Sequence, residues 1–167
     1  MVFTAFHVLI SFIVFRFCCF EFLSFFAGVV APDIEAVYFM KEAYSVCKPN
    51  DYKCLAEYPS HWFLHSFLGI TFLAFLIAIF VYSIRKYFNM KKFELKNLFI
   101  SAWIGGVTHL IVDSTVHKGE DALMLFFPYP EKYSFVFPYS HIFWYAVSLI
   151  GLVLLIISLK DFKKWLS

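Results

Sequence analysis

Long apolar stretches alternate with short polar segments along the chain, and this pattern predicts helices that cross a membrane. Three stretches, residues 62–82, 98–116 and 141–159, are long enough to span a bilayer. Each has about 19 to 21 residues, which measure about 30 Å as an α-helix, the thickness of a hydrocarbon core. His109 and Asp113 are ionisable residues inside the second stretch.

The N-terminal third is also apolar, but it carries Arg16 and Glu21 near its middle. A signal peptide is one interpretation, yet residues 2–31 lack a basic start and are too long for a signal-peptide core. We expect instead two helices, over about 3–17 and 20–31, that turn near Arg16 and Glu21. Each is short for a full span, so we expect the pair to be tilted or re-entrant.

The composition agrees with a membrane protein. Apolar residues make up 62% of the chain and charged residues 16%, with a mean hydropathy of +0.75. A soluble domain is nearer one-half apolar and one-quarter charged, so these values exclude a soluble enzyme and a basic nucleic-acid binder. We predict an all-α, polytopic membrane helix bundle of about five helices, two short N-terminal ones and three full spans. It forms a single domain, 1–167, with residues 41–60 as an outer loop insertion.

The distribution of Lys and Arg predicts the orientation in the membrane. Residues 85–96 carry five basic residues against one acidic residue, and the C-terminal tail is also basic. Basic segments face the cytoplasm, so the acidic segments 33–60 and 117–138 are expected outside. The chain is therefore expected to be a multi-pass protein of the cell membrane. Cys47 and Cys54 lie in the same outer segment, where a disulfide could form.

Histidines and two aspartates gather in the half of the topology that is predicted to face outward. Histidines that only fill space should fall on both sides of the membrane, but all six fall on this side. They are His7, His61, His65, His109, His117 and His141. Ionisable groups within a span are costly and usually functional.

Two pairs have a spacing that suits metal binding. His109 and Asp113 are four residues apart in one predicted helix, so both can reach the same cation. The preceding Gly105-Gly106 pair would let another helix approach closely. His61 and His65 repeat the four-residue spacing at the outer start of another predicted span, so the two pairs should lie at a similar depth.

Each of these residues also has a purely structural interpretation. A His109–Asp113 hydrogen bond could tie helices together, and His61 could be an interfacial residue. Asp33 could cap the following helix, and His7 could be a satisfied core histidine. Convergence at one depth favours a metal site, because imidazole and carboxylate donors suit a divalent metal. We expect Zn²⁺, with Mn²⁺ or Fe²⁺ as alternatives, and one or two ions.

Taken in order, these residues form a set of motifs. The set runs from His7 to Pro32-Asp33-Ile34-Glu35, His61-x-x-x-His65-Ser66 and Gly106-x-x-His109-x-x-x-Asp113. It resembles the YdjM-like family of membrane-bound metal-dependent hydrolases over about residues 1–130, with Gly119 and Pro128 in the places of a later Gly and Pro. The chain departs from the family pattern in having Glu35 for a second Asp and Trp62 for an Arg.

The resemblance implies metal ligands and supporting residues. The implied ligands are His7, Asp33, His65, His109 and Asp113. It also implies a polar supporting role for Glu35, His61 and Ser66. We assign proton relay, a catalytic role, to Glu35 or His61. His117 and Lys118 are candidates for binding the substrate and stabilising its negative charge, or else belong to a solvated loop.

The predicted function is a membrane-bound, metal-dependent hydrolase with an outward-facing His/Asp site. Its expected substrate is a lipid or another membrane-associated phosphoester, because the motif order is analogous to that of zinc-dependent phospholipases C. The alternatives are a structural or regulatory metal site, and an ion or metal transporter. The expected partners are membrane lipid and the substrate, without nucleic acid, and the sequence carries no signal for an oligomeric state.

Overall fold

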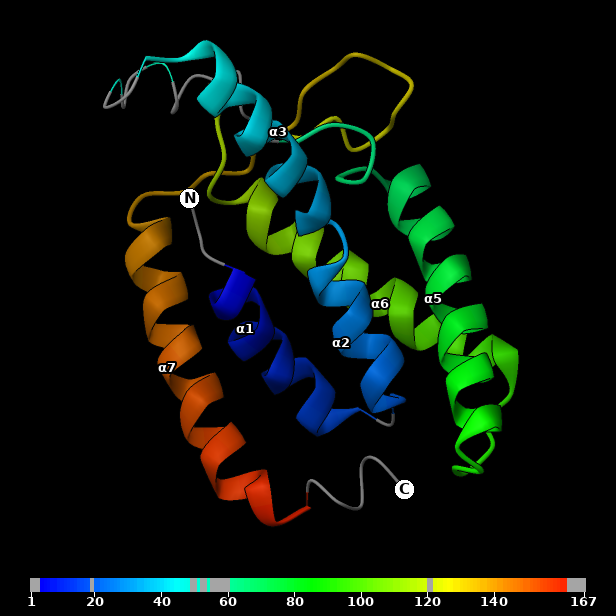
Figure 1. Cartoon of the computed structure of the whole chain (residues 1–167). Coiled ribbons are helices and arrows are strands. Elements are labelled where there is room, and N and C mark those ends of the chain that lie inside the picture. Colours follow the sequence, from blue (N-terminus) through cyan, green and yellow to red (C-terminus); the bar gives the residue numbers. More distant parts are fainter. Residues whose placement is uncertain are drawn as a thin grey trace.

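The computed structural model describes residues 4–18, 20–48, 51, 54, 61–119 and 122–161, and within them the chain is an all-α bundle (Figure 1). Its α-helices are α1 Thr4–Phe17, α2 Phe22–Val30, α3 Asp33–Val46, α5 Phe67–Tyr87, α6 Leu95–Ser114 and α7 Ser140–Ser158. A 3₁₀ turn, Leu159–Asp161, follows α7. The described part has no strand, only an isolated bridge between Leu123 and Tyr133.

Four segments are long and apolar enough to cross a membrane. They are Phe22–Val46, Phe67–Tyr87, Leu95–Ser114 and Ser140–Ser158. The prediction of an all-α membrane helix bundle is confirmed, but it counted three full spans where the structure has four. The extra span arises because α2 and α3 follow each other almost without a break, so that α3 extends into the segment expected as an outer loop. Most of residues 41–60 beyond α3 lie outside the described residues.

Pro32 explains why the sequence suggested a break at this point. It occupies the N-cap position of α3, where a missing backbone N–H costs nothing and the fixed φ angle suits a helix start. The chain therefore continues as helix after the proline, through Asp33 and Glu35 in the first turn. Beyond the end of α3, Cys47 forms a disulfide with Cys54, which the sequence had suggested.

The helix expected over 62–82 begins five residues later, at Phe67. Ser66 is its N-cap, and the Ser66 hydroxyl accepts a hydrogen bond from the Gly69 amide at 3.0 Å. Residues 62–66 form bends and turns instead of helix. His61 and His65 are therefore presented by an irregular segment that precedes α5, and not from one helix face as the spacing predicted.

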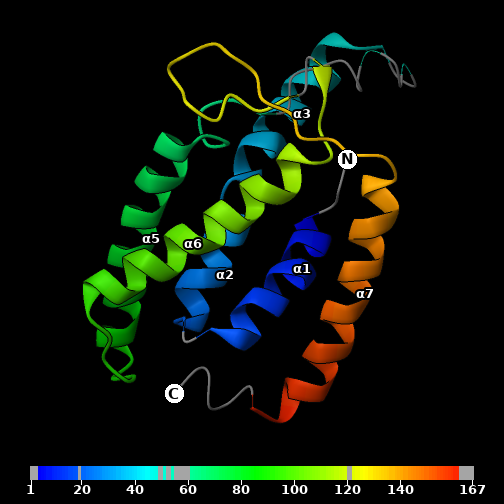
Figure 2. The same ribbon diagram turned by 180° about the vertical axis from the view of Figure 1, so that it is seen from behind.

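Glycines allow the helices to approach closely. A Cβ atom on Gly28 of α2 would lie 2.0 Å from the Ala102 carbonyl oxygen of α6, and one on Gly105 would lie 2.1 Å from the Phe25 carbonyl oxygen. Seen from behind, α6 crosses obliquely over α2 (Figure 2). Gly151 of α7 meets the backbone of α1 in the same way, at the Leu9 carbonyl oxygen. Close helix contacts through small residues are typical of membrane proteins.

One end of the bundle carries the histidines, and the other end carries the basic 85–96 segment. At one end lie the start of α1, the α2–α3 junction and the end of α6; at the other lie the α1–α2 connection and the α5–α6 turn (Figure 1). Between them is an aromatic core with Phe12, Phe15 and Phe25 buried. The histidine-rich residues lie at the first end, and the basic 85–96 segment lies at the second.

Candidate metal centre

Asp113 lies at the centre of a buried cluster of histidines. Its Oδ1 atom lies 2.8 Å from His7 Nε2 and 3.6 Å from His117 Nε2. Its Oδ2 atom lies 3.0 Å from His109 Nε2 and 3.5 Å from His65 Nε2. The Asp113 side chain is 2% exposed, so this charge is almost fully removed from solvent. Four imidazoles thus point a nitrogen at one carboxylate.

Three of these side chains lie on one helical face, two of them within α6 and one just after its end. His109 and Asp113 are one turn apart within the helix, as the sequence predicted. The His117 amide donates to the Asp113 carbonyl oxygen at 2.9 Å, which continues the helical spacing past the end of α6. His117 therefore lies on the same face as the other two and joins the cluster.

Glu35 holds the segment that carries His65. Its carboxylate accepts hydrogen bonds from the backbone amides of Trp62, at 2.7 Å, and Leu64, at 3.1 Å. The same carboxylate lies 3.0 Å from His65 Nδ1. An Nδ1–H that donates to Glu35 leaves the Nε2 lone pair of a neutral His65 facing the cluster. This is the tautomer that a metal ligand requires.

His7 and Asp33 both lie next to His109. The rings of His7 and His109 stack with centroids 4.3 Å apart, and Asp33 Oδ1 lies 3.7 Å from His109 Nε2. His7 comes from α1 and Asp33 from the first residue of α3. Within the described part of the chain, the buried Asp33 Oδ2 and His7 Nδ1 atoms have no hydrogen-bond partner. A buried polar atom without a partner is costly, and a bound cation would satisfy such an oxygen.

The cluster divides into two groups of three ligand atoms. One group is His7, Asp33 and His109; the other is His61, His65 and Asp113. In each group the ligand atoms all lie within 4.8 Å of one another. The groups adjoin, because Asp113 Oδ2 of the second lies 3.0 Å from His109 Nε2 of the first. The ring of His61 contacts those of His65 and His117, with centroids 4.2 and 4.3 Å apart.

The donor set suits a divalent transition metal. Nitrogen and carboxylate oxygen donors, without thiolate, fit Zn²⁺, Mn²⁺ or Fe²⁺ better than an all-oxygen cation such as Ca²⁺. A positive ion would also offset the charge of the buried Asp113, which no Lys or Arg contacts among the described ion pairs. The residues present can therefore hold one metal, and their division into two groups suits two.

A pocket adjoins the second group. It has a volume of about 750 Å³, and its polar wall includes Glu35 and His61. Its other walls are largely apolar and include Tyr38, Trp62 and Met124. The pocket owes its shape to α3, since Tyr38 lies one turn after Ile34 on the part of that helix that flanks it. A molecule with an apolar part could therefore reach His61 from outside the bundle.

The segment after α6 contributes Met124 to the lining of this pocket. Leu123 and Leu125 are buried, and the Phe67 amide donates to the Leu125 carbonyl oxygen at 2.9 Å. The aromatic rings of this segment reach the 61–66 segment, with Phe127 5.4 Å from Phe63 between centroids. Residues 123–130 are thus partly anchored in the core through Leu123 and Leu125.

The structure brings together all five ligands that the resemblance implied. These candidate ligands, His7, Asp33, His65, His109 and Asp113, lie within the cluster together with His61, and Glu35 adjoins it. Lys118 and His141 are exposed outside the two groups.

His117, which was predicted to bind the substrate, contacts Asp113, with its Nε2 atom 3.6 Å from Asp113 Oδ1. The signal in the sequence was its spacing, four residues after Asp113 and eight after His109.

Comparisons with family models, with curated proteins and with solved structures found no match to this chain.

Proposed function

We propose that this protein is a membrane-bound, metal-dependent hydrolase that acts on a lipid or another membrane-associated phosphoester. The single observation that carries the proposal is the pair of adjoining ligand groups around Asp113, one of which borders a pocket through His61. The resemblance to the YdjM-like family supports the same reaction class. Buried metal ligands beside a pocket suit catalysis better than a closed structural site.

Two Zn²⁺ ions are proposed as the cofactor. His7, Asp33 and His109 would hold one ion, and His61, His65 and Asp113 would hold the other. Divalent metals supply Lewis-acid chemistry, in which water is activated at neutral pH and a phosphoryl oxygen is polarised. Paired metals are common in enzymes that cleave phosphoesters.

The surrounding residues have separate tasks in this proposal. Glu35 is a positioning residue, because it fixes the tautomer of His65 and holds the backbone of the 61–66 segment. His61 or His117 can carry a proton between the cluster and the pocket, since their rings are in contact and His61 lines the pocket. The apolar walls exclude water and hold the nonpolar part of a substrate.

The shape and lining of the pocket support a membrane-associated substrate. Tyr38, Trp62 and Met124 offer an apolar surface that suits an acyl chain. Lys132 lines the pocket together with Glu35 and Glu42, so a phosphate there would rely on metal held by the second group to balance its charge. Helix α3, which forms one wall, belongs to a segment long enough to cross the membrane. A lipid could therefore enter the pocket without leaving the bilayer.

The site is proposed to face the extracytoplasmic side. The supporting observation is that the basic 85–96 segment lies at the opposite end of the bundle, and basic segments face the cytoplasm. A cysteine introduced by Lys118→Cys, with Cys47 and Cys54 replaced by Ser, should react with an impermeant maleimide added to intact cells. Labelling only after the membrane is broken would place the site on the cytoplasmic side.

A transport function is less well supported than hydrolysis. A path for an ion would need polar groups from the cluster to the other end of the bundle. The middle of the bundle instead holds an aromatic core, formed by Phe12, Phe15 and Phe25. A structural metal remains the alternative that the experiment must separate from an enzyme.

The decisive experiment measures metal content and hydrolysis together. The protein purified in detergent should contain about two zinc ions per chain when measured by plasma mass spectrometry. His7→Ala and His61→Ala should each lower the stoichiometry by about one ion, because they belong to different groups. Asp113→Asn should lower it further, because Asp113 contacts members of both groups.

The same samples are assayed with bis(p-nitrophenyl) phosphate and with a short-chain phospholipid. Hydrolysis that requires the metal and is lost in Asp113→Asn would support the enzyme. Glu94→Gln, an exposed residue at the other end of the bundle, is the matched control and should change neither readout. Two bound ions without hydrolysis of any phosphoester or carboxylic ester would favour the structural alternative, and a metal-free protein would contradict both.

A further inference from the structure

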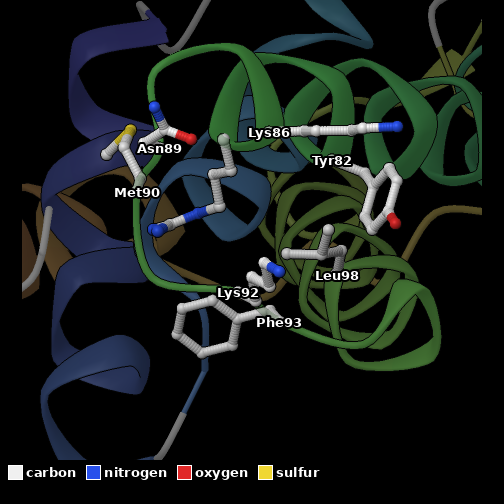
Figure 3. Close-up of a pocket in the computed structure, with 8 residues that line it drawn as sticks. Tyr82, Lys86, Asn89, Met90, Lys92, Phe93 and Leu98 are labelled. Carbon is white, nitrogen blue, oxygen red and sulfur yellow. The ribbon is translucent and has the colours of Figure 1, made fainter.

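A second pocket lies at the opposite end of the bundle, where α5 ends and α6 begins. Its volume is about 400 Å³. The residues that give it its chemical character are Tyr82, Arg85, Lys86, Asn89, Lys92 and Phe93. In Figure 3, Tyr82 and Lys86 reach to one side of the pocket, and Asn89 and Met90 lie on the other. This pocket shares no residue with the histidine cluster.

The base of the pocket is rigidly built around Arg85. The Arg85 side chain is 3% exposed; its Nη2 and Nε atoms donate to Glu21 Oε1 at 2.6 and 3.2 Å. Its Nη1 atom donates to the Lys91 carbonyl oxygen at 3.1 Å, and its guanidinium lies 4.7 Å from the centre of the Phe93 ring. The charge of Arg85 is therefore balanced by Glu21, and the contacts fix the backbone of the α5–α6 turn.

The shape of the turn brings two lysines to the same pocket. Asn89 adopts a left-handed conformation with φ of 51°, and the Met90 amide donates to the Arg85 carbonyl oxygen at 2.9 Å. The chain reverses there, so that Lys92 returns to the pocket wall that Lys86 already lines. Both lysines are exposed, and the lining contains no acidic residue among those described.

The pocket keeps a net positive charge when the buried Arg85–Glu21 pair is left out of the count. Arg85 is matched by Glu21, whereas Lys86 and Lys92 have no carboxylate in the same pocket. Glu94 lines the adjoining groove, which also contains Tyr82, Lys92 and Phe93. Even with Glu94 counted, the 85–96 segment holds five basic residues against one acidic residue. The pocket therefore suits an anion.

The location of the pocket specifies what kind of anion is available. It lies at the end of two helices that are long and apolar enough to span the membrane, which is the level of the lipid headgroups. Next to it, α5 exposes Ile79, Phe80 and Tyr82 to its surroundings, a surface on which acyl chains can lie. Basic pockets between transmembrane helices at this level bind the headgroups of anionic phospholipids.

We propose that this pocket binds the phosphate of an anionic phospholipid headgroup. Lys86 and Lys92 neutralise the phosphate, and the Tyr82 hydroxyl and the Asn89 amide are available to hydrogen-bond with it or with the rest of the headgroup. The acyl chains lie along the exposed face of α5. This site is independent of the proposed hydrolase activity and stands at the other end of the molecule.

The test uses the full-length protein in an uncharged detergent. Dioctanoyl phosphatidylglycerol, dioctanoyl phosphatidylcholine and inorganic phosphate are titrated separately, and bound ligand is counted by native mass spectrometry. The double variant Lys86→Gln/Lys92→Gln removes the two charges from exposed positions and leaves the Glu21–Arg85 pair intact. The matched control is Lys41→Gln/Lys48→Gln, which removes two exposed lysines near the opposite end of the bundle.

Phosphatidylglycerol should bind more tightly than phosphatidylcholine to the wild-type protein and to the control. In the Lys86→Gln/Lys92→Gln variant its Kd should rise about thirtyfold, the equivalent of about 1 kcal/mol for each lysine. Equal binding of the two lipids, or equal loss in the control variant, would overturn the proposal. Saturation by inorganic phosphate, with lipid binding unaffected by the variant, would assign the pocket to a free anion and would overturn the lipid assignment.

Discussion

The Nε2 atoms of His65 and His109 lie 3.2 Å apart, although the two residues come from a loop and a helix. Both atoms are also within 3.5 Å of Asp113 Oδ2. Two neutral imidazoles cannot both direct a lone pair at each other without repulsion, so a proton or a cation must lie between or beside them. Glu35 favours the tautomer of His65 that leaves the inward lone pair available, which is the tautomer that a metal ligand requires.

Removal of metal should therefore lower the stability of the protein. Chelation with EDTA is expected to reduce the melting temperature in detergent, and added Zn²⁺ should restore it. A ligand present at a hundred times its Kd stabilises the folded state by about 2.7 kcal/mol, which is measurable by thermal unfolding. Asp113→Asn serves as the control and should melt at the same temperature with and without EDTA. An EDTA-sensitive Asp113→Asn variant would show that the metal binds elsewhere.

Replacement of Glu35 should weaken metal binding without abolishing it. Glu35→Gln keeps the shape of the side chain but replaces the carboxylate that orients the His65 ring. That carboxylate also accepts hydrogen bonds from two backbone amides. Loss of a residue that hydrogen-bonds to a metal ligand typically lowers metal affinity or activity about ten- to a hundredfold. Competition with a fluorescent zinc chelator measures the affinity. Glu42→Gln, further along α3, is the matched control and should bind zinc as the wild type does.

The crossing of α2 and α6 should tolerate no additional side-chain atom. Gly28→Ala would place its Cβ atom 2.0 Å from the Ala102 carbonyl oxygen, so the helices would have to separate. Because α2 leads directly to Asp33 and α6 carries His109, separation should lower both the melting temperature and the metal content. Gly106→Ala is the comparison, since its Cβ atom would meet the Ile70 side chain at 3.0 Å and side chains can move. An unchanged metal content in Gly28→Ala would contradict this coupling.

The buried Glu21–Arg85 pair should be essential to the stability of the opposite end of the bundle. Glu21 also caps α2, because its carboxylate accepts from the Leu23 and Ser24 amides. Removal of one partner of a buried ion pair leaves an uncompensated charge and typically costs about 3 to 5 kcal/mol. Glu21→Gln is therefore expected to melt well below the wild type.

Removal of both charges should be less harmful than removal of one. The double variant Glu21→Gln/Arg85→Met leaves no unpaired charge, so its melting temperature should lie above that of Glu21→Gln. Additive losses in the double variant would show that the two side chains stabilise the protein separately. Either result is obtained from thermal unfolding of the purified proteins in the same detergent.

Much of the fold followed from the apolar stretches alone, because helices in lipid must satisfy their own backbone hydrogen bonds. The short N-terminal helices expected over 3–17 and 20–31 appear as Thr4–Phe17 and Phe22–Val30. What the sequence could not show was that the chain stays helical after Pro32. A proline at a helix start and a proline at a helix end look alike in sequence, and only packing distinguishes them.

The candidate site shows the same division between local and distant information. The four-residue spacing of His109 and Asp113 predicted their common face, since both lie within one helix. The same spacing was misleading for His61 and His65, because Glu35 binds the amides of Trp62 and Leu64 and Ser66 delays the start of α5. Contacts with a residue almost thirty positions away cannot be read from local periodicity.

The bond between His7 and Asp113 joins residues 106 positions apart in the chain. During synthesis, this contact cannot form until the chain has been made through α6, because His7 belongs to the first helix and Asp113 to α6. Metal loading can follow only after this late closure, so incorporation of the ion would report that insertion of the chain through α6 is complete.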